Sequence, residues 1–230
     1  MIEYKQKIEL TNLYNIPSKA IKKLAKEAIE KEYCGVCVLS NSTGIVARVR
    51  DNAKADLRVI TVAGFPPTNV YDKVGTNPVF QFSLGHYHKA ELEKVRAICE
   101  DSNVDELDLV FPMSLYYLNR KKRIVWLLRG IKKRFKKPVK VIIELGTLFK
   151  KEDNLKEICF LLEEAGIDIV KTNTGLIKQK FEDLADHVQT LLKCTTLPIK
   201  ASGGIRKVKE AEVLSALGIA RIGTSKLSEE

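Results

Sequence analysis

The sequence predicts an α/β fold, a (β/α)8 TIM barrel in which residues 1–230 form a single domain. Short β-branched runs alternate with amphipathic stretches along the chain, which is typical of βαβ units around a parallel sheet. About eight such units within 230 residues match the size of a compact barrel. An open doubly wound sheet normally has a glycine-rich phosphate loop after its first strand. Here Tyr14-Asn15-Ile16-Pro17 follows the first strand, so we favour the barrel.

Eight short runs have the length and residue types of buried strands. In chain order they are Lys7–Leu13, Gly35–Leu39, Leu57–Val62, Glu106–Phe111, Val139–Glu144, Asp168–Thr172, Pro198–Ala201 and Ala220–Gly223.

Six stretches between these runs have apolar residues at helical spacing. They are Ser18–Glu32, His88–Asp101, Leu118–Lys136, Glu152–Ala165, Phe181–Lys193 and Lys207–Leu217. Ser18 follows Pro17 and is expected to cap the first helix, whereas Gly166 and Gly218 are expected to end two later ones. The segment from Pro66 to Tyr87 has little periodicity and is predicted to be a long loop.

The composition is that of a globular protein, with 45% hydrophobic and 30% charged residues. No run approaches the eighteen apolar residues of a membrane span, so we expect no membrane association. The first residues, Met-Ile-Glu-Tyr-Lys-Gln, lack the apolar centre of a signal peptide. These features predict a cytoplasmic protein.

The formal net charge is +10, and the cations gather at Arg120–Arg123 and Arg129–Lys137. Such clusters are found in nucleic-acid-binding proteins. Here, however, they alternate with apolar residues at helical spacing, which is typical of an amphipathic helix with a solvated basic face. We therefore expect no nucleic-acid partner, although a basic barrel that binds nucleic acid is kept as an alternative.

Five cysteines, an odd number, argue against a disulfide framework. Cys34 and Cys37 have C-x-x-C spacing, but redox motifs of this kind need a helix N-terminus to lower the thiol pKa. The pair lies in a predicted strand, so we interpret both as core residues.

Three predicted strands contain a charge near their C-terminal ends: Asp108, Lys171 and Lys200. An unpaired buried charge costs several kcal/mol, and barrel enzymes place their chemistry at this end of the strands. A purely structural ion pair is the alternative. Lys140 is a fourth such charge, but it lies nearer the start of its strand and is a weaker candidate.

Lys171 and Lys200 are on consecutive strands and are expected to be neighbours. Desolvation and a neighbouring cation would together lower one lysine pKa by about 2–4 units, which provides free amine at neutral pH. A free amine can attack a carbonyl to form a Schiff base, and a nearby carboxylate can relay protons. The pattern therefore predicts a lyase or aldolase that needs no cofactor and no metal.

Two glycine-bearing turns follow the last two strands, Ser202-Gly203-Gly204-Ile205-Arg206 and Ile222-Gly223-Thr224-Ser225. Loops at these positions of a barrel often bind phosphate through backbone N–H groups. Ordinary turns are the alternative.

At these residues the chain resembles the deoxyribose-phosphate aldolase family, over most of its length. The stretches that carry the resemblance are Glu9–Leu13, Val36–Val38, Val62–Pro66, Glu106–Val110, Val139–Glu144, Ala165–Gly175, Ile199–Arg206 and Arg221–Ser225. The strings Val-Lys-Thr-x-Thr-Gly and Lys-Ala-Ser-Gly-Gly-Ile-Arg, in this order, are its most specific part.

The resemblance implies reversible cleavage of 2-deoxy-D-ribose 5-phosphate to acetaldehyde and D-glyceraldehyde 3-phosphate. It implies that Lys171 is the Schiff-base lysine, that Lys200 tunes it and that Asp108 relays protons. The phosphorylated sugar is the expected partner, and the family is often dimeric. The residues expected to contact the substrate or its phosphate are Thr11, Cys37, Lys140, Thr172, Gly175, Gly203, Gly204, Arg206, Gly223, Thr224 and Ser225.

The chain departs from the family pattern at four places. Glu9 replaces an Asp, Asn173 replaces a Ser, Leu39-Ser40 replaces Asn-Pro, and Lys226 replaces a Ser beside the phosphate. The Pro66–Tyr87 segment is also longer than usual. A related Schiff-base aldolase with a different acceptor aldehyde is therefore an alternative. A metal-dependent aldolase would have to use His86 and His88, which we expect on the surface.

Overall fold

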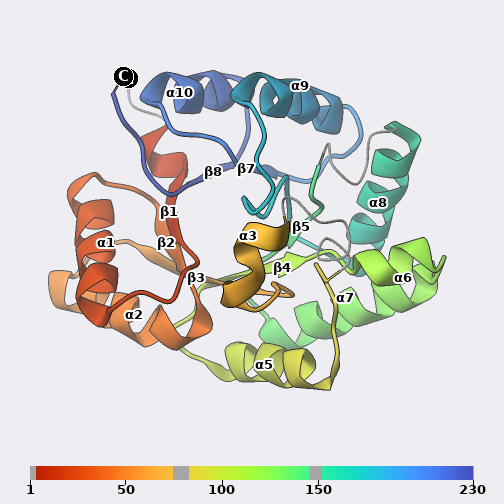
Figure 1. Cartoon of the computed structure of the whole chain (residues 1–230), viewed down its shortest axis with the longest axis horizontal. Coiled ribbons are helices and arrows are strands. Elements are labelled where there is room, and N and C mark those ends of the chain that lie inside the picture. The colour runs from red at the N-terminus through yellow and green to blue at the C-terminus, as the bar shows by residue number, and fades with distance from the viewer. Residues whose placement is uncertain (1–3, 75–82, 146–151, 230) are drawn as a thin grey trace.

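The computed structural model describes residues 4–74, 83–145 and 152–229. Eight parallel strands follow one another around a closed barrel, and the last pairs with the first (Figure 1). The predicted TIM barrel and its eight strands are therefore confirmed. The strands are β1 (Ile8–Asn12), β2 (Gly35–Val38), β3 (Arg58–Ala63), β4 (Glu106–Val110), β5 (Val139–Ile142), β6 (Ile169–Lys171), β7 (Ile199–Ser202) and β8 (Arg221–Thr224).

Helices surround the barrel, and the six that the sequence predicts are all present, one with the predicted bounds and five slightly shorter (Figure 1). They are α1 (Ser18–Glu30), α5 (Lys89–Glu100), α7 (Lys121–Phe135), α8 (Glu152–Ala165), α9 (Phe181–Leu192) and α10 (Val208–Ala216). None of the described helices is long and apolar enough to cross a membrane.

Helix α2 (Thr43–Ala53) is the main element that the sequence does not predict. It contains Gly44 and the β-branched Ile45, Val46 and Val49, which have low helix propensity. Val46 and Ala47 are nevertheless buried in the core, so tertiary packing rather than propensity stabilises this helix. The short helix α6 (Met113–Tyr117) and the 3-10 helices η1 (Lys5–Lys7) and η2 (Ser40–Ser42) were also not predicted.

The predicted loop from Pro66 to Tyr87 contains the 3-10 helix η3 (Thr68–Val70) and helix α3 (Tyr71–Val74), while residues 75–82 lie outside the described part. Figure 1 shows α3 in front of the middle of the barrel. Tyr71 and Val74 are buried in an apolar cluster with residues from the barrel interior, which include Ile60 and Ile142. This segment therefore covers part of the barrel opening.

The two predicted helix-ending glycines are confirmed. Gly166 and Gly218 follow α8 and α10 with positive φ angles of 74° and 83°. The expectation for Ser18 is wrong, because Ser18 is the first residue of α1 and Pro17 holds the cap position without a side-chain cap. The carbonyl of Pro17 instead accepts a hydrogen bond from the N–H of Ala20 (2.8 Å).

Side chains alternate between the two sides of each strand. On β4, Leu107 and Leu109 face outward and pack in the core beneath the helices, whereas Glu106 and Asp108 belong to the alternate set that faces the barrel interior. The outer layer is thus an ordinary apolar core, while the barrel interior contains charges.

Candidate active site

Six charged side chains gather inside the barrel, and each is 3% exposed or less. They come from five strands and comprise three carboxyl and three lysine side chains: Glu9, Glu106, Asp108, Lys140, Lys171 and Lys200. We call them the buried charge cluster. The strand register places Lys171 directly beside Lys200, and Asp108 directly beside Lys140.

Asp108 is at the centre of the cluster, because all three lysines contact it. Its Oδ2 accepts hydrogen bonds from Nζ of Lys171 (2.8 Å) and of Lys200 (2.7 Å). Its Oδ1 accepts one from Nζ of Lys140 (3.1 Å). One carboxylate therefore holds three lysine side chains in a fixed arrangement.

Two further carboxylates complete the charge balance. Glu9 contacts Lys200, and its Oε1 lies 3.2 Å from Nζ of Lys140. Glu106 contacts Lys140 and lies 3.3 Å from Nε of Arg58. Because each charge has partners of opposite sign, the cluster avoids much of the penalty of burial.

These contacts shift the pKa values of Asp108 and Lys200. Burial would raise the pKa of Asp108, but the charges of Lys140, Lys171 and Lys200 hold it well below its usual value. Burial would lower the pKa of Lys200, but Asp108 and Glu9 raise it well above its usual value. Lys200 is therefore cationic at neutral pH, because Asp108, which also contacts Lys171, and Glu9 together outweigh the effect of burial.

A cavity of about 690 Å³ opens above the cluster at the C-terminal ends of the strands. Of the six clustered side chains, Lys171 alone lines this cavity among the residues the structure describes. Lys171 therefore connects the buried charge cluster with the cavity: its Nζ contacts Asp108, and its side chain lines the cavity.

One wall of the cavity is formed by the turn after β7, with Gly203 and Gly204, and by the C-terminal end of β8, with Gly223, Thr224 and the following Ser225. Gly203 and Gly204 have φ angles of 97° and 79°, where other residues are strained. A Cβ atom on Gly204 would lie only 2.9 Å from the carbonyl oxygen of Gln179. This wall therefore requires glycine and exposes backbone to the cavity.

Glu144 was not among the predicted site residues, yet it lies two residues after the end of β5 and is 1% exposed. Its backbone has a φ of 47°, and its Oε2 accepts a hydrogen bond from the N–H of Thr174 (3.0 Å). Burial raises the pKa of Glu144 to about 7, although bonds from Thr174 and the charge of Lys171 oppose the rise. The carboxyl holds the loop after β6, which lines the cavity at Thr174 and Gly175.

The chain matches the family model of DeoC/LacD family aldolases over residues 5–225. It is 32% identical to the deoxyribose-phosphate aldolase of Caldicellulosiruptor saccharolyticus over 215 residues. This aligned region covers 89% of this chain and 86% of that protein. It is 31% identical to the enzyme of the same name from Thermococcus gammatolerans, over 95% of this chain and 90% of that one.

The chain belongs to the DeoC/LacD aldolase family.

Solved structures show the same fold at lower identity. An aldolase called QR15 superposes with a TM-score of 0.76 at 24% identity, over 98% of this chain and 92% of that one. The deoxyribose phosphate aldolase from Aeropyrum pernix, described as a unique tetramer, superposes with a TM-score of 0.73 at 24% identity over 96% of this chain and 86% of its own.

In this aldolase most of the predicted substrate-contacting residues do line the cavity: Thr11, Gly175, Gly203, Gly204, Arg206, Gly223, Thr224 and Ser225. Three others do not line the cavity as the described residues form it. Lys140 is occupied by carboxylates within the cluster, and Cys37 is fully buried. The hydroxyl of Thr172 donates to the carbonyl of Ser202 (3.0 Å), so we leave these three out of the proposed contact set.

The departure at Asn173 is accommodated beneath the cavity. Its Nδ2 donates to the carbonyl of Ser202 (3.0 Å), and Oγ of Ser202 donates back to the carbonyl of Asn173 (2.5 Å). Asn173 thereby ties the loop after β6 to the end of β7. Glu9, the second departure, pairs with Lys200 and Lys140 as described above.

Several lining residues of the cavity were not among the predicted site residues, and four of them have large or charged side chains: Tyr14, Tyr71, Asp72 and Lys178. Tyr14 and Tyr71 pack edge to face with ring centroids 5.6 Å apart, and Asp72 lies beside them. Lys178 adds a cation on the side of the glycine turns. None of the four belongs to a strand. Tyr14 lies in the loop after β1, and Tyr71 and Asp72 lie in the Pro66–Tyr87 segment, so nothing in the sequence indicates their place in the cavity wall.

Cys34 and Cys37 are buried free thiols, as the core interpretation predicts. Burial raises the pKa of both thiols to about 11, so neither is a thiolate at neutral pH.

The histidine pair does not form a metal site with other described residues. His86 and His88 stack edge to face, and Nδ1 of His88 accepts a hydrogen bond from the N–H of Glu91 (3.1 Å) as the cap of α5. Within the described ranges, no group of three or more His, Cys, Asp or Glu side chains is arranged to hold a metal ion.

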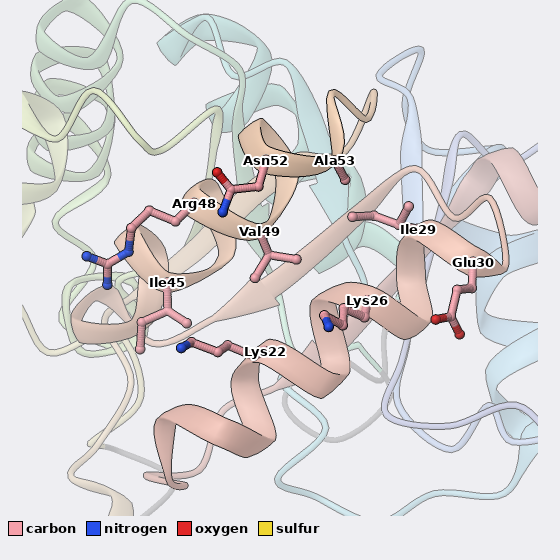
Figure 2. Close-up of a pocket in the computed structure, with 9 residues that line it drawn as sticks. All are labelled: Lys22, Lys26, Ile29, Glu30, Ile45, Arg48, Val49, Asn52 and Ala53. Carbon is pink, nitrogen blue, oxygen red and sulfur yellow. The ribbon is translucent and has the colours of Figure 1, made fainter.

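A second hollow of about 630 Å³ lies on the outer surface between α1 and α2 (Figure 2). Its floor contains Ile29, Ile45 and Val49, and Lys22 and Lys26 stand on its α1 side. It contains no residue of the buried charge cluster, so we place the chemistry in the barrel cavity.

Proposed function

We propose that this chain is a class I aldolase that reversibly cleaves 2-deoxy-D-ribose 5-phosphate to acetaldehyde and D-glyceraldehyde 3-phosphate. The observation that carries the proposal is the position of Lys171, an amine that faces the cavity while it contacts Asp108. The names of the relatives support this substrate.

The proposed reaction begins at the open-chain aldehyde. Nζ of Lys171, as the free amine, bonds to C1, the carbonyl oxygen takes up a proton, and loss of water leaves an iminium ion. Removal of the proton from the C3 hydroxyl then breaks the C2–C3 bond. The electron pair moves to the iminium group to give an enamine, and D-glyceraldehyde 3-phosphate departs. Protonation at C2 and addition of water release acetaldehyde and restore the amine.

Asp108 and Lys200 would relay these protons through water, because both lie beneath Lys171 rather than in the cavity. Lys200 is suited to donate a proton to the carbinolamine oxygen, since Asp108 and Glu9 keep it cationic. The substrate's phosphate would lie against Gly203, Gly204, Gly223 and Ser225, with Arg206 and Lys178 nearby.

The test is mass spectrometry of the intact protein after treatment with acetaldehyde and borohydride. One added ethyl group should appear on Lys171, and Lys171→Leu should abolish it. Lys178→Leu is the matched control, because Lys178 also lines the cavity but lies outside the buried charge cluster. An unchanged adduct in Lys171→Leu would refute the assignment.

A Schiff-base aldolase with a different acceptor aldehyde is the second candidate. It is favoured by the wall of Tyr14, Tyr71 and Asp72, which comes in part from the long Pro66–Tyr87 segment. A panel of phosphorylated and unphosphorylated acceptor aldehydes separates the two. Independence of any cofactor or metal, a cytoplasmic location and a homodimeric state stay predictions.

A further inference from the structure

The hollow between α1 and α2 has an aliphatic floor that the fold leaves partly exposed. Ile29 of α1 and Ile45 and Val49 of α2 are half-buried and pack against the main hydrophobic core from outside. Ile45 and Val49 are about one helical turn apart, and Figure 2 shows both side chains turned toward α1. Apolar surface that is framed by polar side chains is typical of a ligand-binding groove.

Three cations stand around this floor: Lys22 and Lys26 of α1 and Arg48 of α2. None of the three side chains forms an ion pair or a hydrogen bond with another described residue. A neighbouring cation on α2, Arg50, is by contrast paired with Asp105 (2.8 Å). The hollow therefore has positive charge that the described part of the chain does not neutralise.

The charges are unevenly placed along the hollow. Figure 2 shows Lys22 and Arg48 toward one end and Glu30 toward the other. Glu30 is the single carboxylate among the described residues that line the hollow. An anionic group is therefore attracted to the Lys22–Arg48 end and repelled from the Glu30 end, which orients a ligand with one charged group.

We infer that this α1–α2 hollow binds a free organic anion with an aliphatic body, such as a medium-chain carboxylate. The head group lies between Lys22 and Arg48, and the chain covers the aliphatic floor. Ile45 and Ala53 both line the hollow and are eight residues apart on α2, which is about 12 Å along the helix axis. The volume of about 630 Å³ is also that of a small-molecule site.

The size and lining of the hollow disfavour three other ligands. A stable protein interface takes about 20–30 residues from each partner, whereas nine described residues line this hollow. Nucleobases are usually held by stacking on aromatic rings, and none of the nine residues is aromatic. Inorganic phosphate uses the cations but leaves the aliphatic floor exposed to water. An anion with an aliphatic chain uses both features.

An anionic membrane lipid has similar chemistry, but the shape of the site favours the free anion. A helix that binds a membrane surface inserts its apolar face into the lipid. The apolar residues Ile21 and Ala25 of α1 are instead buried in the core. The aliphatic floor is recessed between two helices, so a free molecule can reach it more readily than a bilayer can.

The first test is isothermal titration calorimetry of the full chain with decanoate, kept below its micelle concentration. Decanoate should bind about 10-fold or more tightly than butyrate, because each CH₂ group that leaves water adds to the affinity. Decylammonium, which has the same chain and the opposite charge, should not bind. Methyl NMR spectra should show the bound chain at Ile29, Ile45 and Val49.

A pair of charge variants tests the head-group contacts. Lys22→Gln with Arg48→Gln should weaken decanoate binding by about 10-fold or more. Lys19→Gln with Lys23→Gln is the matched control, because it removes two exposed cations from α1 that do not line the hollow. Arg206→Gln removes a cation from the barrel cavity and excludes binding there. Both controls should leave the affinity unchanged.

The inference is overturned if decanoate does not bind, or if the Lys22→Gln, Arg48→Gln variant binds it as tightly as the wild type does. Binding to vesicles of phosphatidylglycerol without binding of free decanoate would assign these cations to a membrane surface and overturn the inference as well. None of these measurements involves Lys171 or aldol cleavage, so this inference and the proposed function can fail separately.

Discussion

Nζ of Lys171 lies 2.8 Å from Oδ2 of Asp108, and the same oxygen accepts a hydrogen bond from Lys200 at 2.7 Å. One buried carboxylate oxygen therefore bridges the amine that faces the cavity and the amine that does not. All three residues belong to barrel strands. The positions of the two amines therefore do not depend on the conformation of the loops.

Asp108→Asn removes the charge on which the three lysines converge. We expect kcat to fall by about 100-fold or more, because the proposed proton relay is lost. We also expect the free energy of unfolding to fall by about 3–5 kcal/mol, because buried cations lose their partner. Enzyme assays and urea denaturation measure the two effects.

Asp51→Asn is the control, since the side chain of Asp51 is 63% exposed and pairs with Arg50 on the surface. It should change stability by less than about 0.5 kcal/mol. Full activity in Asp108→Asn would remove Asp108 from the relay, even if stability fell as expected.

The cluster should make the protein sensitive to acid. The pKa values of Glu9 and Asp108 are lowered in the fold from ordinary values of 4.5 and 3.8. The native state therefore holds fewer protons than the unfolded chain, and its stabilisation is complete above these values and lost as the pH falls below them.

Urea midpoints measured from pH 7 to pH 3 should fall steeply below about pH 4.5. Glu9→Gln should make that fall shallower, whereas Glu93→Gln, at an exposed position of α5, should leave it unchanged. Parallel curves for the wild type and Glu9→Gln would show that Glu9 is not part of the acid response.

Glu144 should affect the free energy of unfolding in a different pH range from Glu9 and Asp108, and in the opposite direction. Because burial raises its pKa from 4.5 to about 7, the native state holds more protons than the unfolded chain between these values. Stability should therefore decrease as the pH rises from 4.5 to 7, by on the order of 3 kcal/mol at most.

Glu144→Gln should abolish this slope, because the amide cannot ionise yet can still accept the hydrogen bond from Thr174. The loop after β6 should stay ordered in this variant, whereas Glu144→Ala should loosen it and raise KM. If the slope persists in Glu144→Gln, another group is responsible for it.

The strands could be predicted because short apolar runs of this length are typical of buried parallel strands. Asp108, Lys171 and Lys200 could be identified because each is a charged residue within such a run. Their partners could not be predicted. Glu9 contacts Lys200 across 191 residues of sequence, and only the closure of β8 on β1 brings them together. For the same reason the raised pKa of Lys200 could not be predicted, because it depends on contacts with Asp108 and Glu9.

The irregular segments account for most of what was missed. Tyr71 lies in a four-residue helix with no periodic pattern, and it becomes part of the cavity wall only because α3 lies over the barrel opening. Helix α2 was missed because Gly44 and several β-branched residues obscure its pattern. Local propensity does not encode either placement.

The glycine turn after β7 gives the most direct test of where the phosphate binds. Gly204→Ala places a Cβ atom 2.9 Å from the carbonyl oxygen of Gln179, and this backbone atom cannot rotate away. The φ of 79° adds strain of about 1–2 kcal/mol for any residue with a side chain. The turn must therefore shift, and the backbone that faces the cavity moves with it.

We expect KM for 2-deoxy-D-ribose 5-phosphate to rise by about 10-fold or more in Gly204→Ala. The kcat/KM for unphosphorylated 2-deoxy-D-ribose should stay near the wild-type value, because that sugar has no phosphate to lose contact with. Gly218→Ala is the matched control: it has a similar φ of 83° but nothing within 4 Å of the added Cβ atom. It should reduce stability only by the strain of the positive φ, about 1–2 kcal/mol, and leave both kinetic constants unchanged. If Gly204→Ala impairs the two sugars equally, the turn supports the barrel end in general and the phosphate binds elsewhere in the cavity.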